Sequence, residues 1–135
     1  MNTLLGKIVD IQSSDRISLI NVDVEGDIFS SIVLEGKKAP LNYRLKDKVN
    51  ILFKETEVGI AKDLSGLISL RNRFKAQIKK VELGTILTKL TLSYKARLIE
   101  SIISTKSAKD MKLKEGDPVE WLVKTNEVSL IPQPK

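Results

Sequence analysis

Apolar and polar residues alternate along most of the chain, which is the pattern of β-strands that bury one face. The pattern recurs in two series of stretches, one in each half of the chain: 7–11, 17–24, 27–33, 49–53 and 58–61, then 77–81, 86–94, 97–103, 119–123 and 128–131. Five short strands in about 65 residues are typical of a small closed or nearly closed barrel, because an open sheet of that size leaves unprotected edges.

The two series are related by a constant offset of about 70 positions, without a gap. Identical residues at this offset include Asn2 and Asn72, Ser31 and Ser101, Lys54 and Lys124, Glu57 and Glu127, and Val58 and Val128. An offset that holds from Asn2 to Val58 indicates a duplicated unit. We therefore predict an all-β protein of two tandem five-stranded barrels, residues 1–66 and 67–135, with the boundary near Gly66.

Each unit has room for at most one short helix, between its third and fourth strands. In the second unit, Ser104 is expected to cap a helix at residues 105–110, with Met111 facing the core. The matching stretch of the first unit, residues 36–41, contains Gly36 and Pro40, which disfavour a helix.

Composition argues against catalysis. The chain contains neither Cys nor His, which excludes disulfides, thiolate metal sites and every Ser-His or Cys-His nucleophile. No Gly-rich phosphate loop is present either. The acidic residues of the first unit are spaced as a solvated face would be: Asp10, Asp15, Asp23, Glu25 and Asp27. We predict a protein that is not an enzyme.

The net charge of +6 indicates an anionic partner without saying which one. No apolar run approaches the roughly 18 residues that a membrane span needs. The first residues, Met1 to Lys7, lack the long apolar core of a secretory signal. A cytoplasmic protein without a membrane partner is therefore expected.

Small five-stranded barrels often bind single-stranded nucleic acid, which is the alternative function. Such binders stack bases on exposed aromatic side chains, and aromatic residues make up only 4% of this chain. Four of them occupy apolar-face positions: Phe29, Phe53, Phe74 and Trp121. Only Tyr43 and Tyr94 are expected to be free, so nucleic acid is the less favoured partner.

The second unit carries an ordered series of short motifs. They are Ser69-Leu70-Arg71-Asn72, Ile102-Ile103-Ser104, Ser107-Ala108, Leu113-Lys114-Glu115-Gly116 before Val119, and Lys124-Thr125-Asn126-Glu127-Val128. Taken in this order, over nearly all of residues 69–131, the series resembles the molbindin (Mop) family of TOBE-type domains. Modules of this family also occur as tandem pairs.

The resemblance implies a barrel like that of oligonucleotide/oligosaccharide-binding (OB) proteins, with a site for molybdate or tungstate. It implies non-catalytic storage, homeostasis or sensing, in a homo-oligomer (dimer or trimer) with sites at subunit interfaces. Arg71 and Lys124 would balance the charge of the dianion, and three residues would donate hydroxyl or backbone hydrogen bonds: Ser69, Ser104 and Thr125. Asn72 would brace the local turn more than touch the ligand.

The first unit departs from this pattern. Met1 stands where the second unit has Arg71, Leu34 where it has Ser104, and Glu55 where it has Thr125. A carboxylate at position 55 would repel a dianion unless the side chain turns away. Of the implied ligands only Lys54 remains, so we predict one oxyanion site per chain. The first unit is then either mainly structural or lends Lys54 and backbone donors to a site completed by another subunit.

Overall fold

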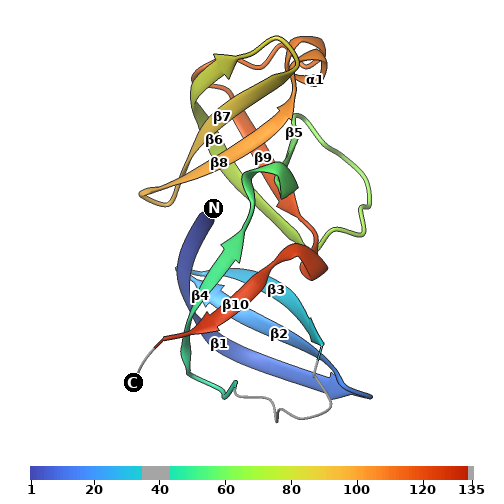
Figure 1. Ribbon diagram of the computed structural model, residues 1–135, viewed down its shortest axis with the longest axis vertical. Helices are drawn as coiled ribbons and strands as arrows, with labels where there is room; N and C mark the ends of the chain where they lie inside the picture. Colours follow the sequence, from blue (N-terminus) through green and yellow to red (C-terminus); the bar gives the residue numbers. More distant parts are fainter. Residues whose placement is uncertain (35–42, 134–135) are drawn as a thin grey trace.

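The computed structural model describes residues 1–34 and 43–133, which form an all-β structure with very little helix (Figure 1). The strands are β1 (Asn2–Ser14), β2 (Ile17–Val24), β3 (Asp27–Leu34), β4 (Lys48–Phe53), β5 (Gly59–Ala61), β6 (Asn72–Leu83), β7 (Leu87–Tyr94), β8 (Arg97–Ser104), β9 (Pro118–Val123) and β10 (Ser129–Pro132). One α-helix, α1 (Thr105–Asp110), and two 3₁₀ turns, η1 (Glu55–Glu57) and η2 (Thr125–Glu127), complete the described part. The predicted all-β class is confirmed.

The strands form two curled antiparallel sheets that exchange their last strands. The first sheet has the order β10-β4-β1-β2-β3, and the second has the order β5-β9-β6-β7-β8. The expectation that each unit is closed by its own last strand is therefore wrong. The 58–61 and 128–131 stretches are too short to select a neighbour by their own pattern. A boundary near Gly66 divides the repeats of the sequence but does not separate the two sheets.

Side chains that are identical in the two repeats hold them together. The amide of Asn72 accepts from Ser30 N–H (2.7 Å) and donates to Ser30 C=O (2.9 Å), as a neighbouring strand would. Asn2 makes the equivalent pair with the backbone of Glu100, at 2.8 Å each. Each amide thus hydrogen-bonds to the backbone of an edge strand, β3 for Asn72 and β8 for Asn2.

A second pair of contacts repeats the same symmetry. The Ser31 hydroxyl donates to Val128 C=O (2.6 Å), and the Ser101 hydroxyl donates to Val58 C=O (2.7 Å). Both serines are buried. The repeated Asn, Ser and Val positions are therefore explained by the contact between repeats, not by a ligand.

One hydrophobic core runs through both sheets. At its centre lie five buried aromatic residues from both repeats: Phe29, Phe53, Phe74, Tyr94 and Trp121. Phe29 stacks on Phe74 with ring centroids 4.1 Å apart, and Phe53 stacks on Trp121 at 5.4 Å. The expectation that Tyr94 is free is wrong, because it is 1% exposed and its hydroxyl donates to Asp27 at 2.7 Å. Tyr43 is half-buried and donates to Leu130 C=O.

The predicted helix of the second unit is confirmed. Ser104 is its N-cap, with the side-chain oxygen accepting from Ser107 N–H at 3.1 Å. Ala108 and Thr105 are its buried residues, whereas Met111 follows the helix and is only half-buried. The matching 36–41 stretch lies outside the described residues. Within residues 1–34 and 43–133, no helix has the length and apolar character that a membrane span requires.

A bidentate ion pair joins β6 to β9 and makes stability depend on pH. Arg73 Nε and Nη2 donate to the Glu120 carboxylate at 2.6 and 2.9 Å, and this hydrogen bonding lowers the pKa of Glu120 below its ordinary 4.5. A lowered pKa stabilises the folded state above the ordinary value, and that contribution is lost as the pH falls through the folded-state pKa.

We expect Arg73→Met to lower the midpoint of thermal unfolding by a few degrees at pH 7. The difference from the unmodified chain should narrow as the pH falls below the ordinary glutamate pKa of 4.5, because Glu120 is then protonated in the unfolded chain and progressively in the folded one. Thermal unfolding followed by circular dichroism from pH 3 to 7 measures it. Lys80→Met is the matched control, because the Lys80–Glu82 pair on the same strand is solvent-exposed. A difference independent of pH would contradict this prediction.

Candidate functional site

A groove of about 640 Å³ lies between the two edge strands of the second sheet, β5 and β8. One wall comes from the first repeat, through η1 and β5, and includes Val58 and Ile60. The other comes from the second repeat and includes Ile102, Ser104 and Lys124. The structure thus brings together two of the predicted site residues, Ser104 and Lys124, in a mainly apolar groove that both repeats build.

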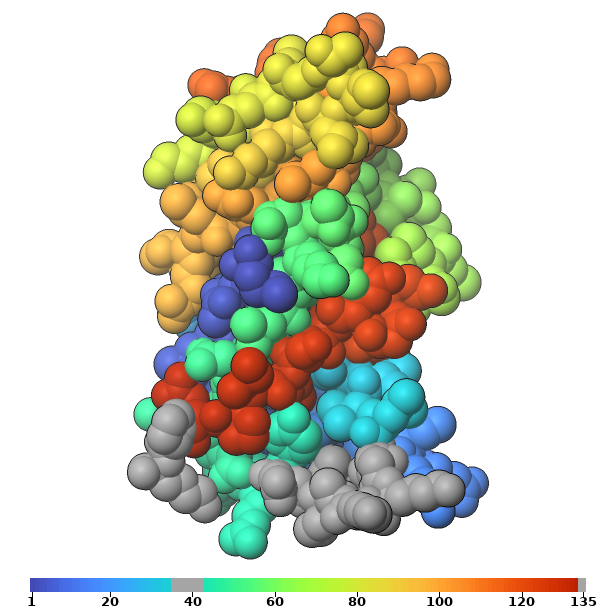
Figure 2. All heavy atoms as spheres, viewed as in Figure 1, coloured from blue at the N-terminus to red at the C-terminus, as the bar shows by residue number. Residues whose placement is uncertain are grey.

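Lys54 lies in a smaller groove of about 220 Å³, lined also by Met1, Phe53 and Ile131. At the repeat offset, Lys54 corresponds to Lys124, and β10 takes the place of β5. Glu57 and Glu127 line both grooves. Figure 2 shows why: η1, in green, and η2, in red, lie beside one another on this face.

The other predicted site residues do not line the large groove. Ser69 and Arg71 are exposed on the connector, although the alternating residues Ile68 and Leu70 line the groove. Thr125 follows Lys124 and is half-buried. Asn72 is fully buried, and its amide is engaged by Ser30. It braces the other repeat, so its expected role in the local turn is corrected.

Hydrogen bonds hold the Ser104 side chain at the border of the groove. Its hydroxyl caps α1 and donates to the Ser107 hydroxyl at 2.9 Å. The neighbouring Thr105 hydroxyl donates to Gly84 C=O (2.9 Å) and therefore accepts from Thr88 (2.8 Å). This buried chain fixes α1 to the turn before β7. Ser104 is consequently held in place beside the groove, at a position that remains exposed.

Charge within the groove is unfavourable for a dianion bound by one chain alone. Among the described residues, the ionisable ones that line it are Lys124, Glu57 and Glu127, which sum to one negative charge. Sequence reasoning missed the two glutamates and the wall supplied by β5. The signal for the glutamates was present, because Glu57 and Glu127 are identical at the repeat offset.

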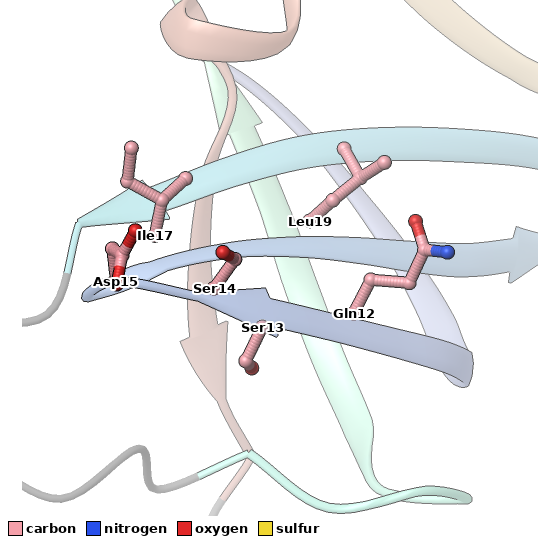
Figure 3. Close-up of a pocket in the computed structure, with 6 residues that line it drawn as sticks. All are labelled: Gln12, Ser13, Ser14, Asp15, Ile17 and Leu19. Carbon is pink, nitrogen blue, oxygen red and sulfur yellow. The ribbon is translucent and has the colours of Figure 1, made fainter.

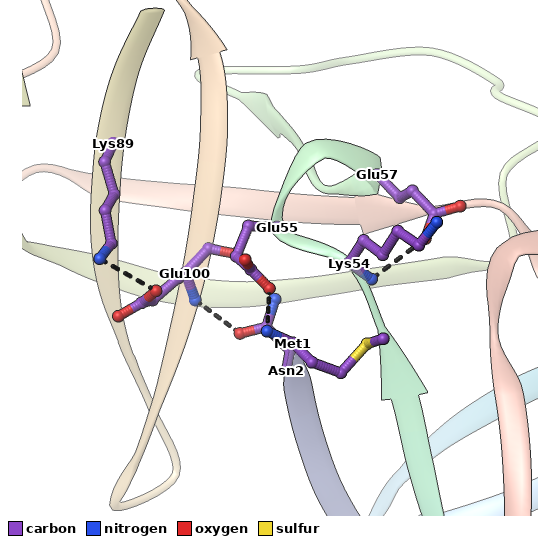
Figure 4. Close-up of polar contacts among 7 residues, drawn as sticks. All are labelled: Met1, Asn2, Lys54, Glu55, Glu57, Lys89 and Glu100. Atoms are coloured by element: carbon purple, nitrogen blue, oxygen red, sulfur yellow. Dashed lines mark hydrogen bonds and ion pairs between the residues drawn. The ribbon is translucent and has the colours of Figure 1, made fainter. Parts of the chain in front are cut away.

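Polar contacts engage the carboxylates near the smaller groove (Figure 4). Glu55 contacts the α-ammonium group of Met1, and hydrogen bonding to this group lowers the pKa of Glu55. The Glu57 carboxylate accepts from Lys54 N–H at 3.0 Å. Glu100 pairs with Lys89 through its side chain, at 3.2 Å, and with Asn2 through its backbone. The carboxylate at position 55 is thus turned toward Met1.

A third hollow, of about 670 Å³, lies at the end of the β1–β2 hairpin (Figure 3). Its lining residues are Gln12, Ser13, Ser14, Asp15, Ile17 and Leu19. Among the described residues, this lining includes one carboxylate and no cation, which does not suit an anion. Among the described residues, no group of three His, Cys, Asp or Glu side chains is placed to hold a metal ion.

Comparison with known proteins identifies a domain in the second repeat and a similar fold. Residues 68–130 match the family model described as the TOBE domain. Among curated proteins, none matches the chain. The chain is similar to a crystal structure of the cytoplasmic molybdate-binding protein ModG, in a form with molybdate bound. The identity is 21% over 96% of this chain and 94% of that chain, with a TM-score of 0.89. The resemblance predicted from the sequence is confirmed by this domain match and by the shared fold.

Proposed function

We propose that this chain, whose residues 68–130 form a TOBE domain, binds a tetrahedral oxyanion, molybdate or tungstate, without catalysing a reaction. The observation that carries the proposal is the meeting of Ser104 and Lys124 in one groove built by both repeats. The fold shared with ModG, a molybdate-binding protein, supports the same ligand class. We propose that residues 1–66 and 67–135 are two domains, and that each domain contributes most of the strands of one OB-like barrel.

The chemistry of these residue types suits such a ligand. Molybdate presents only acceptor oxygens, so every neighbour must donate a hydrogen bond. Lys124 supplies a compact positive charge. The Ser104 hydroxyl would become a donor to the anion by turning away from Ser107, and Thr125, next to Lys124, would add a second hydroxyl from the border of the groove. The apolar lining of the groove, including Ile60 and Ile102, would reduce water around the bound anion and strengthen these interactions.

The same site is proposed to be completed by a second copy of the chain, in a dimer or trimer. Within one chain the groove has one lysine against two glutamates, which disfavours a dianion. Ser69 and Arg71 are exposed at its border and are available to a neighbouring copy. A cytoplasmic role in storing, buffering or sensing the anion would follow from this arrangement.

Single-stranded nucleic acid is not favoured. Five of the six aromatic residues are buried in the shared core, and Tyr43 is half-buried with its hydroxyl engaged. The structure therefore offers no aromatic platform among the residues it describes.

Isothermal titration calorimetry of the full chain with molybdate, using sulfate as the control, tests the function. We expect saturable binding of one molybdate per chain and weaker or no binding of sulfate. Light scattering on the same sample measures the assembly. Absence of heat with both anions, together with no thermal stabilisation by molybdate, would contradict the proposal.

Substitutions at Ser104 separate the helix cap from the anion site. Aspartate is as good an N-cap as serine, so Ser104→Asp should keep the stability of α1 while its carboxylate opposes a dianion. We expect this variant to lose molybdate binding by at least tenfold and to unfold near the temperature of the unmodified chain. Ser104→Ala removes the cap without adding a charge. It should destabilise the fold by about 1 kcal/mol and weaken molybdate binding less than Ser104→Asp does. Calorimetry and thermal unfolding of both variants provide the comparison.

A further inference from the structure

The turns that join β2 to β3 and β7 to β8 have the same backbone but opposite charges. Glu25 and Gly26 form one turn with φ angles of 49° and 97°, and Lys95 and Ala96 form the other with 45° and 60°. Two successive positive φ angles are typical of the type I′ hairpin turn. At the repeat offset, Glu25 corresponds to Lys95 and Asp27 to Arg97. The charge sign is therefore reversed at equivalent positions.

These two turns contact each other across the two repeats. Lys95 Nζ donates to Glu25 C=O at 3.0 Å and lies 3.8 Å from the Asp27 carboxylate. Arg97 Nη2 lies 3.9 Å from the Glu25 carboxylate. The Tyr94 hydroxyl, from a ring buried in the core, donates to Asp27 at 2.7 Å. In Figure 1 the β7–β8 hairpin accordingly extends toward the first sheet.

The duplicated polar contacts between the repeats cannot distinguish one repeat from the other, whereas the Lys62–Asp117 ion pair (3.2 Å) and the Tyr43 hydrogen bond to Leu130 C=O have no equivalent at the repeat offset. Asn2 and Asn72 make the same pair of backbone hydrogen bonds, as do Ser31 and Ser101 with the carbonyl groups of Val128 and Val58. Two first repeats, or two second repeats, would satisfy these contacts equally well. The aromatic core distinguishes an unlike pair of repeats from a like pair by the fit of its side chains, but only after these side chains have packed together.

We propose that the charge-reversed turns are a recognition surface that directs each repeat to pair with an unlike repeat, within one chain or in a second copy. Pairing two first repeats would place Glu25 and Asp27 against the same carboxylates, and pairing two second repeats would place Lys95 and Arg97 against the same cations. Charges at the surface act at longer range than core packing, so they favour the unlike pair before the core forms.

A charge-reversal cycle in the full chain tests this, using E25K, R97E and the double variant E25K/R97E. Asp27 is left in place so that the Tyr94 hydrogen bond remains. At low ionic strength we expect each single variant to lower the thermal midpoint by about 2–5 °C, and the double variant to regain at least half of the summed loss. At about 0.5 M salt the losses should shrink, because the screening length falls below 5 Å.

Ser14→Lys, which adds a cation on an exposed position of β1 at the opposite end of the β1–β2 pair from the β2–β3 turn, controls for net charge. If a single variant fails to fold, folding of the double variant would support the proposal equally. Losses that simply add in the double variant, or that do not change with salt, would overturn it.

Discussion

Asn72→Leu is expected to lower the free energy of unfolding by about 2–5 kcal/mol, because it leaves two buried backbone groups without a partner. Ser30, whose N–H and C=O both bond to the Asn72 amide, is 3% exposed, so water does not replace the lost bonds. Leucine has a similar volume, which limits any cavity contribution. Urea denaturation followed by tryptophan fluorescence measures the change, because Trp121 lies in the shared core.

Asn2→Leu is the matched comparison, since Asn2 makes the same pair of bonds to Glu100. Glu100 is half-buried, so water can partly replace them, and we expect about half the loss. A loss below about 1 kcal/mol for Asn72→Leu would show that this amide does not join the repeats as described.

Lys124→Gln is expected to weaken molybdate binding by about 2–4 kcal/mol, roughly 30- to 1000-fold, because Lys124 is the only cation among the described residues that line the large groove. Glutamine keeps most of the side-chain length and a donor, so the loss reports charge. Lys54→Gln is the matched control at the equivalent position of the first repeat, and it should change the affinity less than twofold. Titration calorimetry compares the three proteins.

Equal losses for Lys54→Gln and Lys124→Gln would mean that the two grooves contribute equally. The prediction of one site per chain would then fail. An unchanged affinity for a folded Lys124→Gln chain would place the anion elsewhere.

Much of the architecture followed from the sequence, because alternation and duplication are local signals. The predicted 17–24 and 86–94 stretches match β2 and β7 within one residue, and Ser104 caps the predicted helix. The predicted 7–11 and 77–81 stretches are only the middle of the longer strands β1 (Asn2–Ser14) and β6 (Asn72–Leu83). The exchange of β5 and β10 could not be predicted. Strands of three and four residues carry no information about which sheet they join, and either pairing satisfies their backbone.

The candidate site was predicted in part. Ser104 and Lys124 meet in one groove, but Arg71 and Ser69 lie outside its lining. The identity of Asn72 with Asn2 at the repeat offset could reflect a residue that supports the ligand site or one that joins the two repeats. The hydrogen bond of Asn72 to Ser30, which the sequence does not reveal, shows that it joins the repeats. Tyr94 was misassigned because Lys95 and Ala96 after it suggest a solvated turn, whereas the turn lies against the first repeat.

The central claim is that an oxyanion binds in the groove between β5 and β8, beside Ser104 and Lys124. Crystals of the full chain grown with tungstate, measured at the tungsten absorption edge, locate the anion directly. We predict one anomalous peak per chain within contact of Lys124. A peak beside Lys54 instead, or none in either groove at saturating tungstate, would contradict the account.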